Sequence, residues 1–582
     1  MSEPSIIRRG FRLVAGYVRA HPASFAVAVT GSVIYAAGTV LSTVALGYAT
    51  NETIIPAFEG GDSNPWAAIV GLMGVAILRT GGVVVRRYYA GLTAAHTKAD
   101  LQRGMADRIL SMPLDRVRSR PHGQLLSHID ADAESAIDAI HPLPFSIGVI
   151  SMLIFGTISL ALLDVPLLLV TLALLPVIAV MSWLNATIIQ NPAAIERQAN
   201  NAVTAAASEI IEGVQVVKTL GREDAETALF AEKVDQLRRA RVRLGMRKTA
   251  FAVSFSAVPQ LTTILILAVG AMRVGDGQLD AGGLVQAVSL FSVLAFPLQV
   301  IGFFLFDLPP SVVGHDRVSL VMSEPDDPLL LTAGGSQLPN GPLSARLDSV
   351  CVGDDERSRL KSANLEIVGG ETLAVVGPTA GGKSTVLEVL ARLRPCNDGA
   401  VLVEATPVLQ IDDTSLRSKL TLATQTASLF HGSVLDNVRF SRQISDEAVV
   451  DALLMAGADD LQTELVDGFE TVIGERGVTL SGGQRQRVAL ARALAGTPGM
   501  VLLDDATSAV DPALEEQIIK RLSDLPMTVV MVTHRVAAMI AADRVALVAG
   551  GRVVEVADHK SLLRNPTYRG LVDAYLASEV LG

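Results

Sequence analysis

The sequence of 582 residues is too long for one globular domain, because domains usually contain roughly 100–200 residues. Half of the residues are hydrophobic and 18% are charged, and the apolar excess lies almost wholly before residue 310. The net charge of -11 gives no reason to expect nucleic acid as a partner, since a polyanion requires a basic surface. The two cysteines, Cys351 and Cys396, exclude a disulfide framework. The composition therefore predicts a membrane half followed by a soluble half.

The first 22 residues form an amphipathic segment that contains several arginines. Its apolar positions are interrupted, and no small-residue cleavage site follows closely, as a signal peptide would require. We therefore expect a helix that lies in the membrane interface.

Six segments are long and apolar enough, or nearly so, to cross a bilayer, which takes about 20 residues of helix. They are residues 24–49, 66–90, 142–163, 165–190, 249–272 and 281–306. Arg79 interrupts the second segment, and its guanidinium would cost several kcal/mol in lipid. We therefore expect Arg79 to face a helix interface or an aqueous cavity.

The connections between these segments differ in charge. The first short connection, NETIIPAFEGGDSNP, contains acids and no lysine or arginine, whereas the long connections after the second and fourth segments contain many arginines. The positive-inside rule therefore places the long connections, the N-terminus and the C-terminal half in the cytoplasm. Apolar residues at helical spacing within the long connections predict helices that extend from the membrane into the cytosol.

Residues 323–342 contain many prolines, glycines and acids, which is typical of a linker. After residue 343, short aliphatic segments alternate with helical ones, and this pattern predicts a sheet covered on both faces. We therefore expect an α-helical membrane domain at 1–322, a linker at 323–342, and an α/β domain at 343–582.

The segment ETLAVVGPTAGGKSTVLEVLARL predicts a strand, a glycine-rich turn and a helix, and the turn fits the P-loop motif G-x-x-x-x-G-K-[ST]. In this motif backbone amides bind phosphates, the lysine reaches the β- and γ-oxygens, and the serine binds Mg²⁺. The candidates are Gly377, Pro378, Thr379, Ala380, Gly381, Gly382, Lys383, Ser384 and Thr385, with Ser384 as a metal ligand. The alternative is a chance glycine-rich turn, and the flanking strand and helix argue against it.

The segment MVLLDD at residues 500–505 predicts a buried strand that ends on two aspartates. We expect Asp504 at the Mg²⁺ ion and Asp505 near the γ-phosphate. Acids at the end of a strand also cap helices or form turns, but the P-loop upstream favours the metal-nucleotide role. The predicted cofactors are therefore ATP and Mg²⁺.

Between these motifs, residues 480–484 read LSGGQ and begin a predicted helix. This motif resembles the signature of ATP-binding cassette (ABC) proteins. In that family the N-terminus of the signature helix faces the γ-phosphate bound by the other cassette of a dimer. The backbone amides at a helix N-terminus favour binding of an anion such as phosphate. The resemblance implies nucleotide contacts for Ser481, Gly482, Gly483 and Gln484. Further motifs in the family's order imply Gln425 as a metal ligand and catalytic residue, Glu475 in the coupling loop, Asp511 in the loop that faces the opposite cassette, and the catalytic switch His534.

The long connections resemble the two cytoplasmic loops of the exporter-type ABC fold, so the resemblance covers essentially the whole chain. It implies six transmembrane helices fused to one P-loop ABC domain. Such a half-transporter must pair with a second half-transporter, in a lipid bilayer, to complete two ATP sites. It also implies domain-swapped coupling helices near residues 112–122 and 210–225.

Three positions depart from the family pattern. Before the P-loop, LDSVCVGDDERSRL offers no aromatic residue to stack on adenine, and Val352 or an arginine stem is the alternative cover. Ala380 and Gly381 stand where many relatives have Gly-Ser or Ser-Gly, and we expect this change to be neutral. Asp505 stands where the family has a catalytic glutamate.

A carboxylate that is one methylene shorter should bind Mg-ATP but hydrolyse it slowly, because a misplacement of about 1 Å can cost on the order of 100-fold in rate. In the family such a change is typical of heterodimers in which one ATP site is degenerate. The intact signature of this chain would then complete the partner's catalytic site. The alternatives are a tolerated substitution, with an ordered water in the gap, and a homodimer with two slow sites. Retention of His534 argues against complete degeneracy.

The leading interpretation is an ATP-driven transporter of the exporter fold, and the alanine- and valine-rich usage indicates a bacterial inner membrane. A soluble ABC ATPase acting on DNA or ribosomes is a second hypothesis, which the six segments argue against. An ATP-gated channel and a siderophore-type importer on the same fold stay open. Few polar residues lie at mid-span, so a hydrophobic or amphipathic cargo such as a drug or lipid is expected. Arg79, Tyr35 and Gln299 are the candidate contacts, although hydrogen bonding between helices is the more ordinary interpretation of each.

Overall fold

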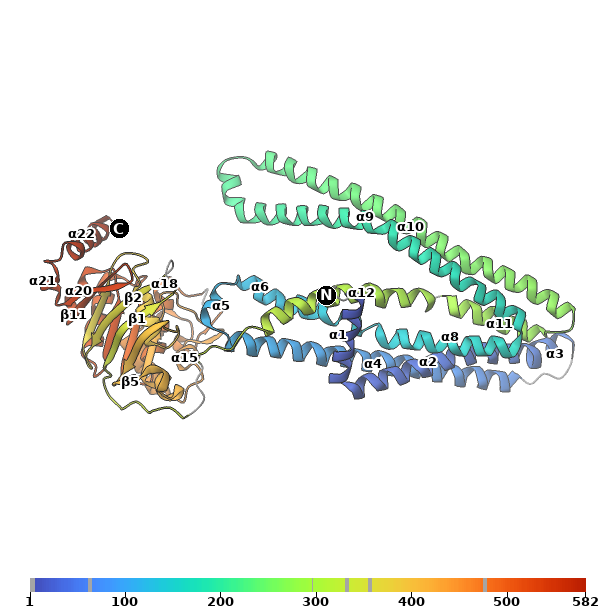
Figure 1. The fold of residues 1–582 in the computed structure, drawn as a ribbon, viewed down its shortest axis with the longest axis horizontal. Coiled ribbons are helices and arrows are strands. Elements are labelled where there is room, and N and C mark those ends of the chain that lie inside the picture. Colours follow the sequence, from blue (N-terminus) through green and yellow to red (C-terminus); the bar gives the residue numbers. More distant parts are fainter. Residues whose placement is uncertain are drawn as a thin grey trace. The chain divides into compact units, whose positions relative to one another are not determined.

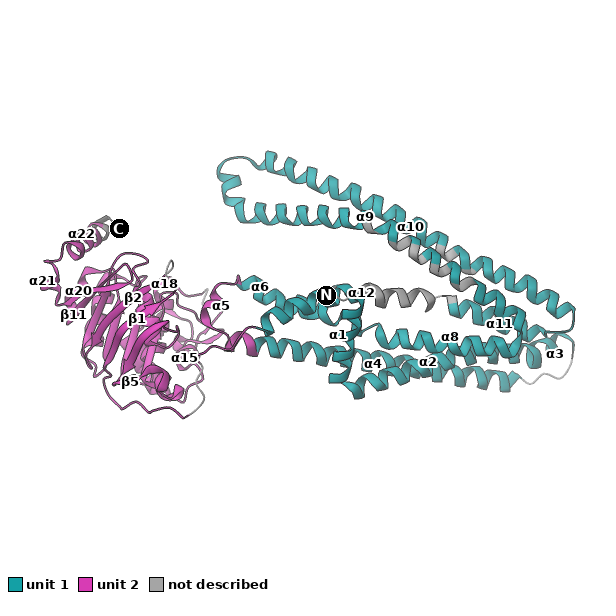
Figure 2. Cartoon of the chain, in the orientation of Figure 1, with its two compact units in different colours: residues 1–106, 122–323 teal, residues 107–121, 324–582 magenta. Residues whose placement is uncertain are grey.

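The computed structural model describes residues 6–60, 65–295, 297–329, 334–353, 358–474 and 479–581 (Figure 1). The chain folds as two compact units (Figure 2). Unit 1 contains residues 1–106 and 122–323, and unit 2 contains residues 107–121 and 324–582. The segment 107–121 thus belongs to the unit of the predicted cassette, although it precedes that unit by about 200 residues of chain.

Unit 1 is built from helices. Their bounds are α1 Ile6–Ala20, α2 Pro22–Ala49, α3 Ile55–Phe58, α4 Pro65–Ser111, α6 His122–Ser127, α7 Ala133–Ile137, α8 Leu143–Leu163, α9 Val165–Thr219, α10 Glu223–Gly275, α11 Ala281–Ala295 and α12 Pro297–Met322, with π-helical turns at Thr50–Ile54 and His128–Asp132 and a 3₁₀ turn at Asp138–Ile140. The helices α9 and α10 run side by side over most of their length (Figure 1). The predicted helical nature of both long connections is confirmed, because α4 continues into the first of them, and α9 and α10 form the second with a short turn between Thr219 and Glu223.

Within the described residues, three helical stretches are long and apolar enough to cross a membrane. They are Pro22–Phe58, Pro65–Ser111 and His122–Leu163. Shorter apolar stretches lie at Gln260–Gly275 and Ala281–Leu294. The predicted spans at 165–190, 249–272 and 281–306 fall on α9, α10 and α11 with α12, and their crossing of the membrane stays a prediction.

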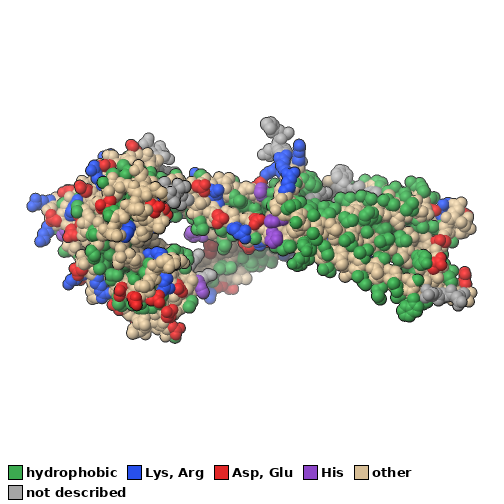
Figure 3. Space-filling view, turned by 90° about the horizontal axis from the view of Figure 1, so that it is seen from below, with side chains coloured by type: hydrophobic (Ala, Val, Ile, Leu, Met, Phe, Trp, Pro, Cys, Tyr) green, Lys and Arg blue, Asp and Glu red, His purple; other side chains and the backbone are tan. Residues whose placement is uncertain are grey.

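Hydrophobic side chains cover much of the surface of unit 1 that Figure 3 shows. On α4, the exposed fractions of Trp66, Val70 and Ile77 are 68%, 67% and 68%. Large apolar side chains with such exposure require another apolar environment. The outer face of α4 is therefore suited to lipid or to another chain.

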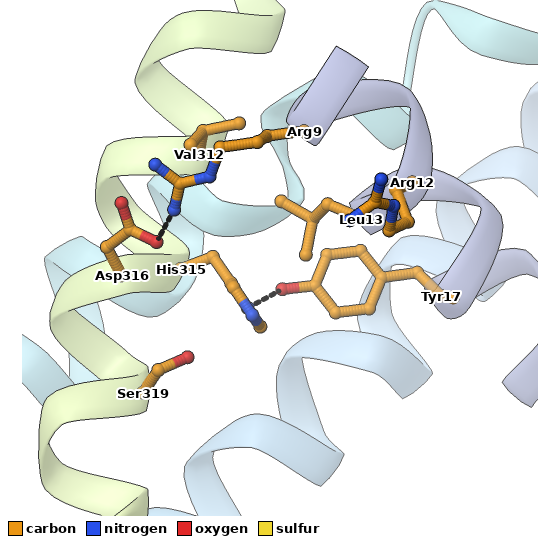
Figure 4. A pocket seen from close by; sticks show the side chains of 9 residues that line it. Arg9, Arg12, Leu13, Tyr17, Val312, His315, Asp316 and Ser319 are labelled. Carbon is orange, nitrogen blue, oxygen red and sulfur yellow. Dashed lines mark hydrogen bonds and ion pairs between the residues drawn. The ribbon is translucent and has the colours of Figure 1, made fainter. Parts of the chain in front are cut away.

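The amphipathic helix α1 is held against the C-terminal half of α12 (Figure 4). The Nη2 atom of Arg9 lies 2.5 Å from Oδ1 of Asp316. The hydroxyl of Tyr17 lies 2.9 Å from Nδ1 of His315, and the two rings meet edge to face. These polar contacts border a cavity of about 520 Å³. The predicted N-terminal helix is thus formed, while its place in a membrane interface stays a prediction.

Unit 2 contains two main sheets. The antiparallel sheet has the order β2-β1-β4-β5, and the larger sheet has the order β12-β11-β3-β10-β9-β6. The strands are β1 Ala345–Val352, β2 Leu360–Ile367, β3 Thr372–Val376, β4 Asp398–Val403, β5 Thr406–Pro407, β6 Leu420–Ala423, β7 Gly432–Ser433, β8 Val472–Ile473, β9 Met500–Asp504, β10 Thr528–Val532, β11 Arg544–Ala549 and β12 Arg552–Ala557. The helices are α5 Leu114–Arg118, α13 Lys383–Leu390, α14 Asp413–Lys419, α15 Val434–Arg439, α16 Asp446–Met455, α17 Leu461–Glu464, α18 Gly482–Leu494, α19 Pro512–Ser523, α20 Val536–Ala541, α21 His559–Leu562 and α22 Pro566–Leu581. The predicted α/β fold of this half is confirmed.

The centre of the larger sheet is parallel, as continuous apolar strands predict. β10 pairs in parallel with both β3 and β9, and every residue of β3 and β10 is buried. The last pair of β10 and β9 joins Val532 to Asp504. The carboxyl ends of the three strands therefore lie at one edge of the sheet, where the segments that follow them meet.

The short helix α5 docks on the cassette of its own chain, in unit 2. Nη2 of Arg394 donates to Oδ1 of Asp115 at 2.7 Å, and Nε of Arg394 donates to Oε2 of Glu388 at 2.6 Å. Arg118 forms a second ion pair with Glu388 at 2.5 Å. Residues 112–118 therefore contact the cassette of their own chain, and the expected contact with a second cassette stays a prediction. Residues 210–225 lie in unit 1, at the turn between α9 and α10.

Candidate functional site

The P-loop follows β3 directly and leads into α13. Gly377 has a φ of 153°, and a Cβ atom there would lie 1.9 Å from the carbonyl oxygen of Val548, so no larger residue fits. The loop borders a cavity of about 260 Å³. Its described lining residues are Arg359, Ala380, Gly381, Gly382, Lys383, Ser384 and Thr385. Six of the predicted phosphate-binding residues therefore face one cavity.

Lys383 is buried at the start of α13. Its Nζ donates to the carbonyl oxygens of Gly377 at 2.9 Å and of Pro378 at 3.0 Å. Burial lowers the pKa of Lys383, and the charges of Asp505 and Asp504 oppose this shift. The ammonium group thus bonds loop carbonyls in this structure, and a phosphate oxygen could take their place.

Ser384 and Asp504 lie side by side, as the predicted Mg²⁺ site requires. The Ser384 hydroxyl donates to Oδ1 of Asp504 at 2.8 Å. Burial raises the pKa of Asp504, the hydrogen bond from Ser384 opposes the shift, and Asp505 adds to it. Mg²⁺ prefers oxygen ligands and is often held by one or two protein groups together with nucleotide phosphates and water. The pair fits this pattern, because it offers two oxygen atoms. Among the described residues there is no group of three or more acids, histidines or cysteines that could hold a metal ion.

Asp505 begins the segment after β9 and meets Gln425. The Gln425 amide donates to Oδ2 of Asp505 at 3.3 Å. Asp505 has a φ of 51°, a left-handed conformation in which aspartate is found more often than most residues. The structure thus brings together two of the three predicted catalytic residues and offers a backbone reason for aspartate at position 505.

His534 contacts a residue that the sequence did not indicate. Its Nδ1 lies 3.0 Å from the hydroxyl of Tyr575 on α22, and that hydroxyl donates to the carbonyl oxygen of Gly377 at 3.1 Å. A hydroxyl has one proton, so Tyr575 accepts from Nδ1 of His534 in this arrangement. Tyr575 therefore joins the predicted switch histidine to the first residue of the P-loop. Nothing near position 575 in the sequence signals this role, because only tertiary folding brings α22 to the P-loop.

The signature residues form the N-terminus of α18. The Ser481 hydroxyl accepts from the amide of Gln484 at 3.2 Å, and Oε1 of Gln484 accepts from the amide of Ser481 at 2.8 Å. This reciprocal pair is a capping box, for which serine and glutamine three residues apart are suited. A Cβ atom at Gly483 would lie 2.7 Å from the carbonyl oxygen of Ala509. The motif thus defines a helix start packed closely on the segment before α19.

Asp511 caps α19 by accepting from the amide of Ala513 at 2.9 Å. Gln486 of α18 connects to the same region, since its side chain bonds Ser508 at 2.9 Å and the amide of Ala509 at 2.7 Å. No residue of Ser481–Gln484 is among the described lining residues of the P-loop cavity. The signature and the P-loop of one chain therefore do not form one cavity. Glu475 lies outside the described residues.

The region predicted to cover adenine contains an exposed arginine. Val352 is 3% exposed and cannot offer a stacking surface, whereas Arg359 is exposed and lines the P-loop cavity. Ala380 has a φ of 61°, a conformation that costs a non-glycine residue roughly 1–2 kcal/mol. The expectation that alanine is neutral for phosphate binding at this position stays a prediction.

Comparison with known proteins gives two matching family models. The model described as ABC transporter transmembrane region matches residues 23–298, and the model described as ABC transporter matches residues 360–508. A multidrug efflux ATP-binding/permease protein of Mycobacterium tuberculosis is 30% identical over 516 residues, which cover 87% of this chain and 43% of that protein. An ATP-dependent lipid A-core flippase of Albidiferax ferrireducens is 28% identical over 546 residues, which cover 90% of this chain and 93% of that protein.

An ABC transporter B family member 1 of Dictyostelium discoideum is 27% identical over 523 residues, which cover 88% of this chain. The chain spans 43% of the length of the mycobacterial relative and 57% of the length of the Dictyostelium relative. It is thus similar to about half of each of these longer proteins, and to nearly all of the flippase.

Replacing Asp504 with asparagine should stabilise the protein without nucleotide while removing its response to Mg²⁺. Because burial raises the pKa of Asp504, its ionised form destabilises the fold at neutral pH, and this penalty fades as pH falls through the raised pKa. In thermal unfolding curves between pH 3 and 8, we expect Asp504→Asn to melt higher at pH 8. The difference should shrink as pH falls through the raised pKa and vanish only below the ordinary pKa of 3.8. Added Mg-ATP should raise the melting temperature of the original protein only. Equal curves at pH 8 would contradict the proposed burial penalty, and the exposed Asp467→Asn serves as control.

Replacing Tyr575 with phenylalanine should slow ATP turnover about fivefold, since about 1 kcal/mol of hydrogen bonding that orients His534 is lost. The change is measured as kcat and KM for ATP of the full chain, and KM should change less than twofold. Tyr568→Phe is a matched control, because its hydroxyl bonds Nδ1 of His559 at 2.7 Å from the same helix. Equal kcat values for both variants would show that Tyr575 has no special role.

Proposed function

This chain belongs to the ABC transporter family, with a transmembrane region and an ATP-binding domain fused in one polypeptide, and we propose that it is one half of an ATP-driven transporter with the exporter fold. The single observation that carries the proposal is the incomplete nucleotide site. Lys383, Ser384 and Asp504 meet at the P-loop, while Ser481 lies on a helix N-terminus outside that cavity. A second cassette must therefore supply the signature.

The pairing partner is proposed to be a different half-transporter. The support is Asp505, whose shorter carboxylate would hold the attacking water poorly, and the ordered signature helix, which could serve a partner's site. The length of the mycobacterial relative agrees, because this chain covers only 43% of it and leaves room for a second segment of similar size. A homodimer with two slow sites is the second candidate, favoured by the retained contact between Gln425 and Asp505.

Coupling between the cassette and the membrane helices is proposed to pass through α13 and α5. Lys383 and Ser384 begin α13, and Glu388 follows on the same helix. Glu388 is paired with Arg118 of α5 and with Arg394, which also holds Asp115 of α5. A movement of α13 on binding nucleotide would therefore displace α5, which connects directly to α4 and α6.

The proposed setting is a bacterial inner membrane, with the N-terminus and the cassette in the cytoplasm. The apolar stretches of unit 1 support a membrane location, and the arginine-rich long connections support the orientation. A hydrophobic or amphipathic cargo is proposed because the membrane half offers mainly apolar surface. Export is the proposed direction, in keeping with the names of the multidrug efflux and flippase relatives.

Replacing Asp505 with glutamate should raise ATP turnover of the chain alone by about 10- to 100-fold. The carboxylate would reach one methylene further, and this gain must exceed the cost of glutamate in a left-handed conformation. ATP hydrolysis is measured with the full chain in lipid nanodiscs. Ser481→Ala should abolish the gain, because the serine completes the site of the other copy. Asp467→Glu adds the same methylene at an exposed position and should change nothing.

If the original chain already hydrolyses ATP at the rate of the Asp505→Glu variant, the degenerate-site proposal fails while the transporter proposal stands. If neither form binds or hydrolyses ATP, the transporter proposal itself fails.

Removing the contact between α5 and the cassette should uncouple them. Asp115→Asn is expected to weaken docking of α5 by about 1 kcal/mol, because one half-exposed partner of the Arg394 pair is lost. Binding of a fluorescent ATP analogue should stay unchanged, whereas stimulation of hydrolysis by cargo should fall. Asp348→Asn removes a comparable arginine pair, with Arg346, and should leave both quantities unchanged. Equal stimulation in the two variants would exclude this coupling route.

A further inference from the structure

A second cavity, of about 680 Å³, lies among α2, α4 and α8 in unit 1. Its described lining residues are Tyr35, Ser42, Leu72, Ala76, Arg79, Thr80, Val83, Arg86, Arg87 and Phe145. Three arginines of the predicted second span, residues 66–90, thus line one cavity. The lining contains no aspartate or glutamate among the residues that the structure describes.

The packing of α2 on α4 explains why these side chains reach the cavity. A Cβ atom at Gly31 would lie 2.7 Å from the backbone nitrogen of Arg86, and one at Gly38 would lie 3.2 Å from Cα of Arg79. The glycines of α2 therefore let the two backbones approach closely at both arginines. No room for a long side chain is left between the helices, so the guanidinium groups extend beside the contact.

Two aromatic rings hold the guanidinium groups in place. Cζ of Arg86 lies 4.2 Å from the centre of the Phe145 ring and 5.0 Å from the centre of the Tyr35 ring. Cζ of Arg79 lies 5.7 Å from the centre of the same Tyr35 ring. Such contacts orient a cation but leave its N–H groups without acceptors. The more ordinary interpretation of Arg79 and Tyr35 is hydrogen bonding between helices. The described contacts show cation–π contacts instead. The side chain of Gln299 lies outside the described residues.

The charge of these arginines is not balanced within the described part of the chain. Nη1 of Arg86 is buried and has no hydrogen-bond partner there, and no ion pair joins Arg79, Arg86 or Arg87 to a described acid. The six predicted spans contain no aspartate or glutamate at all. The spans of a second copy of this chain would therefore supply no counterion either. Charged groups at membrane depth are costly and usually mark a functional site.

We infer that this cavity binds the anionic group of an amphiphile, and that the cargo of the proposed transporter is therefore an amphiphile with a phosphate, sulfate or carboxylate head. The inference rests on the proposed function for the step from ligand to cargo. Arginine suits such heads because its planar fork bonds two oxygens at once. The apolar lining, Leu72, Ala76 and Val83, offers a surface for the start of an alkyl chain.

Binding of radiolabelled dodecyl phosphate to the full chain in phosphatidylcholine nanodiscs tests the inference without requiring hydrolysis. We expect saturable binding that Arg86→Gln weakens at least tenfold and that Arg86→Lys weakens less. Arg103→Gln is the matched control, because Arg103 is an exposed residue of the same helix, outside the cavity. Charge reversal by Arg86→Glu should weaken the binding of dodecyl phosphate and strengthen the binding of dodecyltrimethylammonium. A misfolded variant would not gain binding of the cation.

The arms of the experiment separate the sources of the anion. Millimolar inorganic phosphate should not displace dodecyl phosphate if the ligand is an amphiphile, and displacement would overturn that part of the inference. The site would be overturned if the original chain and Arg86→Gln bound dodecyl phosphate with equal affinity. It would also be overturned if the original chain bound dodecyltrimethylammonium as tightly as dodecyl phosphate. These binding measurements do not involve ATP hydrolysis. They therefore test the cavity independently of the transporter proposal, which measurements of ATP turnover test.

Discussion

The parallel pairing of β3, β10 and β9 is the constraint on which the nucleotide site depends. The three strands are almost fully buried, and their register brings Val376, Val532 and Asp504 to the same edge of the sheet. The P-loop, His534 and Asp505 all follow directly from these strand ends. Because side chains alternate along a strand, a slip of one residue would turn Asp504 to the opposite face. The hydrophobic pattern of the sheet therefore fixes the geometry of the metal and phosphate ligands.

The same edge is connected to parts of the chain that carry no sequence motif for ATP. α13 begins with the P-loop lysine and ends near the ion pairs of Glu388 with α5, so phosphate contact and α5 docking share one helix. On the other side, Tyr575 of α22 bonds both His534 and Gly377. The P-loop and the helix that it begins are thus in contact with both α5 and the C-terminal helix.

In the membrane half, glycine and arginine act together. Close approach of α2 and α4 at Gly31 and Gly38 displaces the side chains of Arg86 and Arg79 toward one cavity. The sequence signalled Arg79 alone, because a single charge within an apolar run is conspicuous, while Arg86 and Arg87 could be taken for the cytoplasmic end of the span. The number of arginines facing one cavity, and the absence of an acid among its described lining, depend on which faces of three helices meet.

The sequence by itself determined the fold class, the two-part organisation and the identity of the P-loop, strand-end and signature residues. These features depend on local patterns, namely apolar run length, strand and helix periodicity and glycine at fixed spacing, which one stretch of chain can display. Only the tertiary structure decided that α5 docks on its own cassette, that Ala380 and Asp505 have left-handed backbones, and that Tyr575 meets His534. Those facts join residues distant in sequence or depend on dihedral angles that neighbouring strands impose, and no local pattern encodes them.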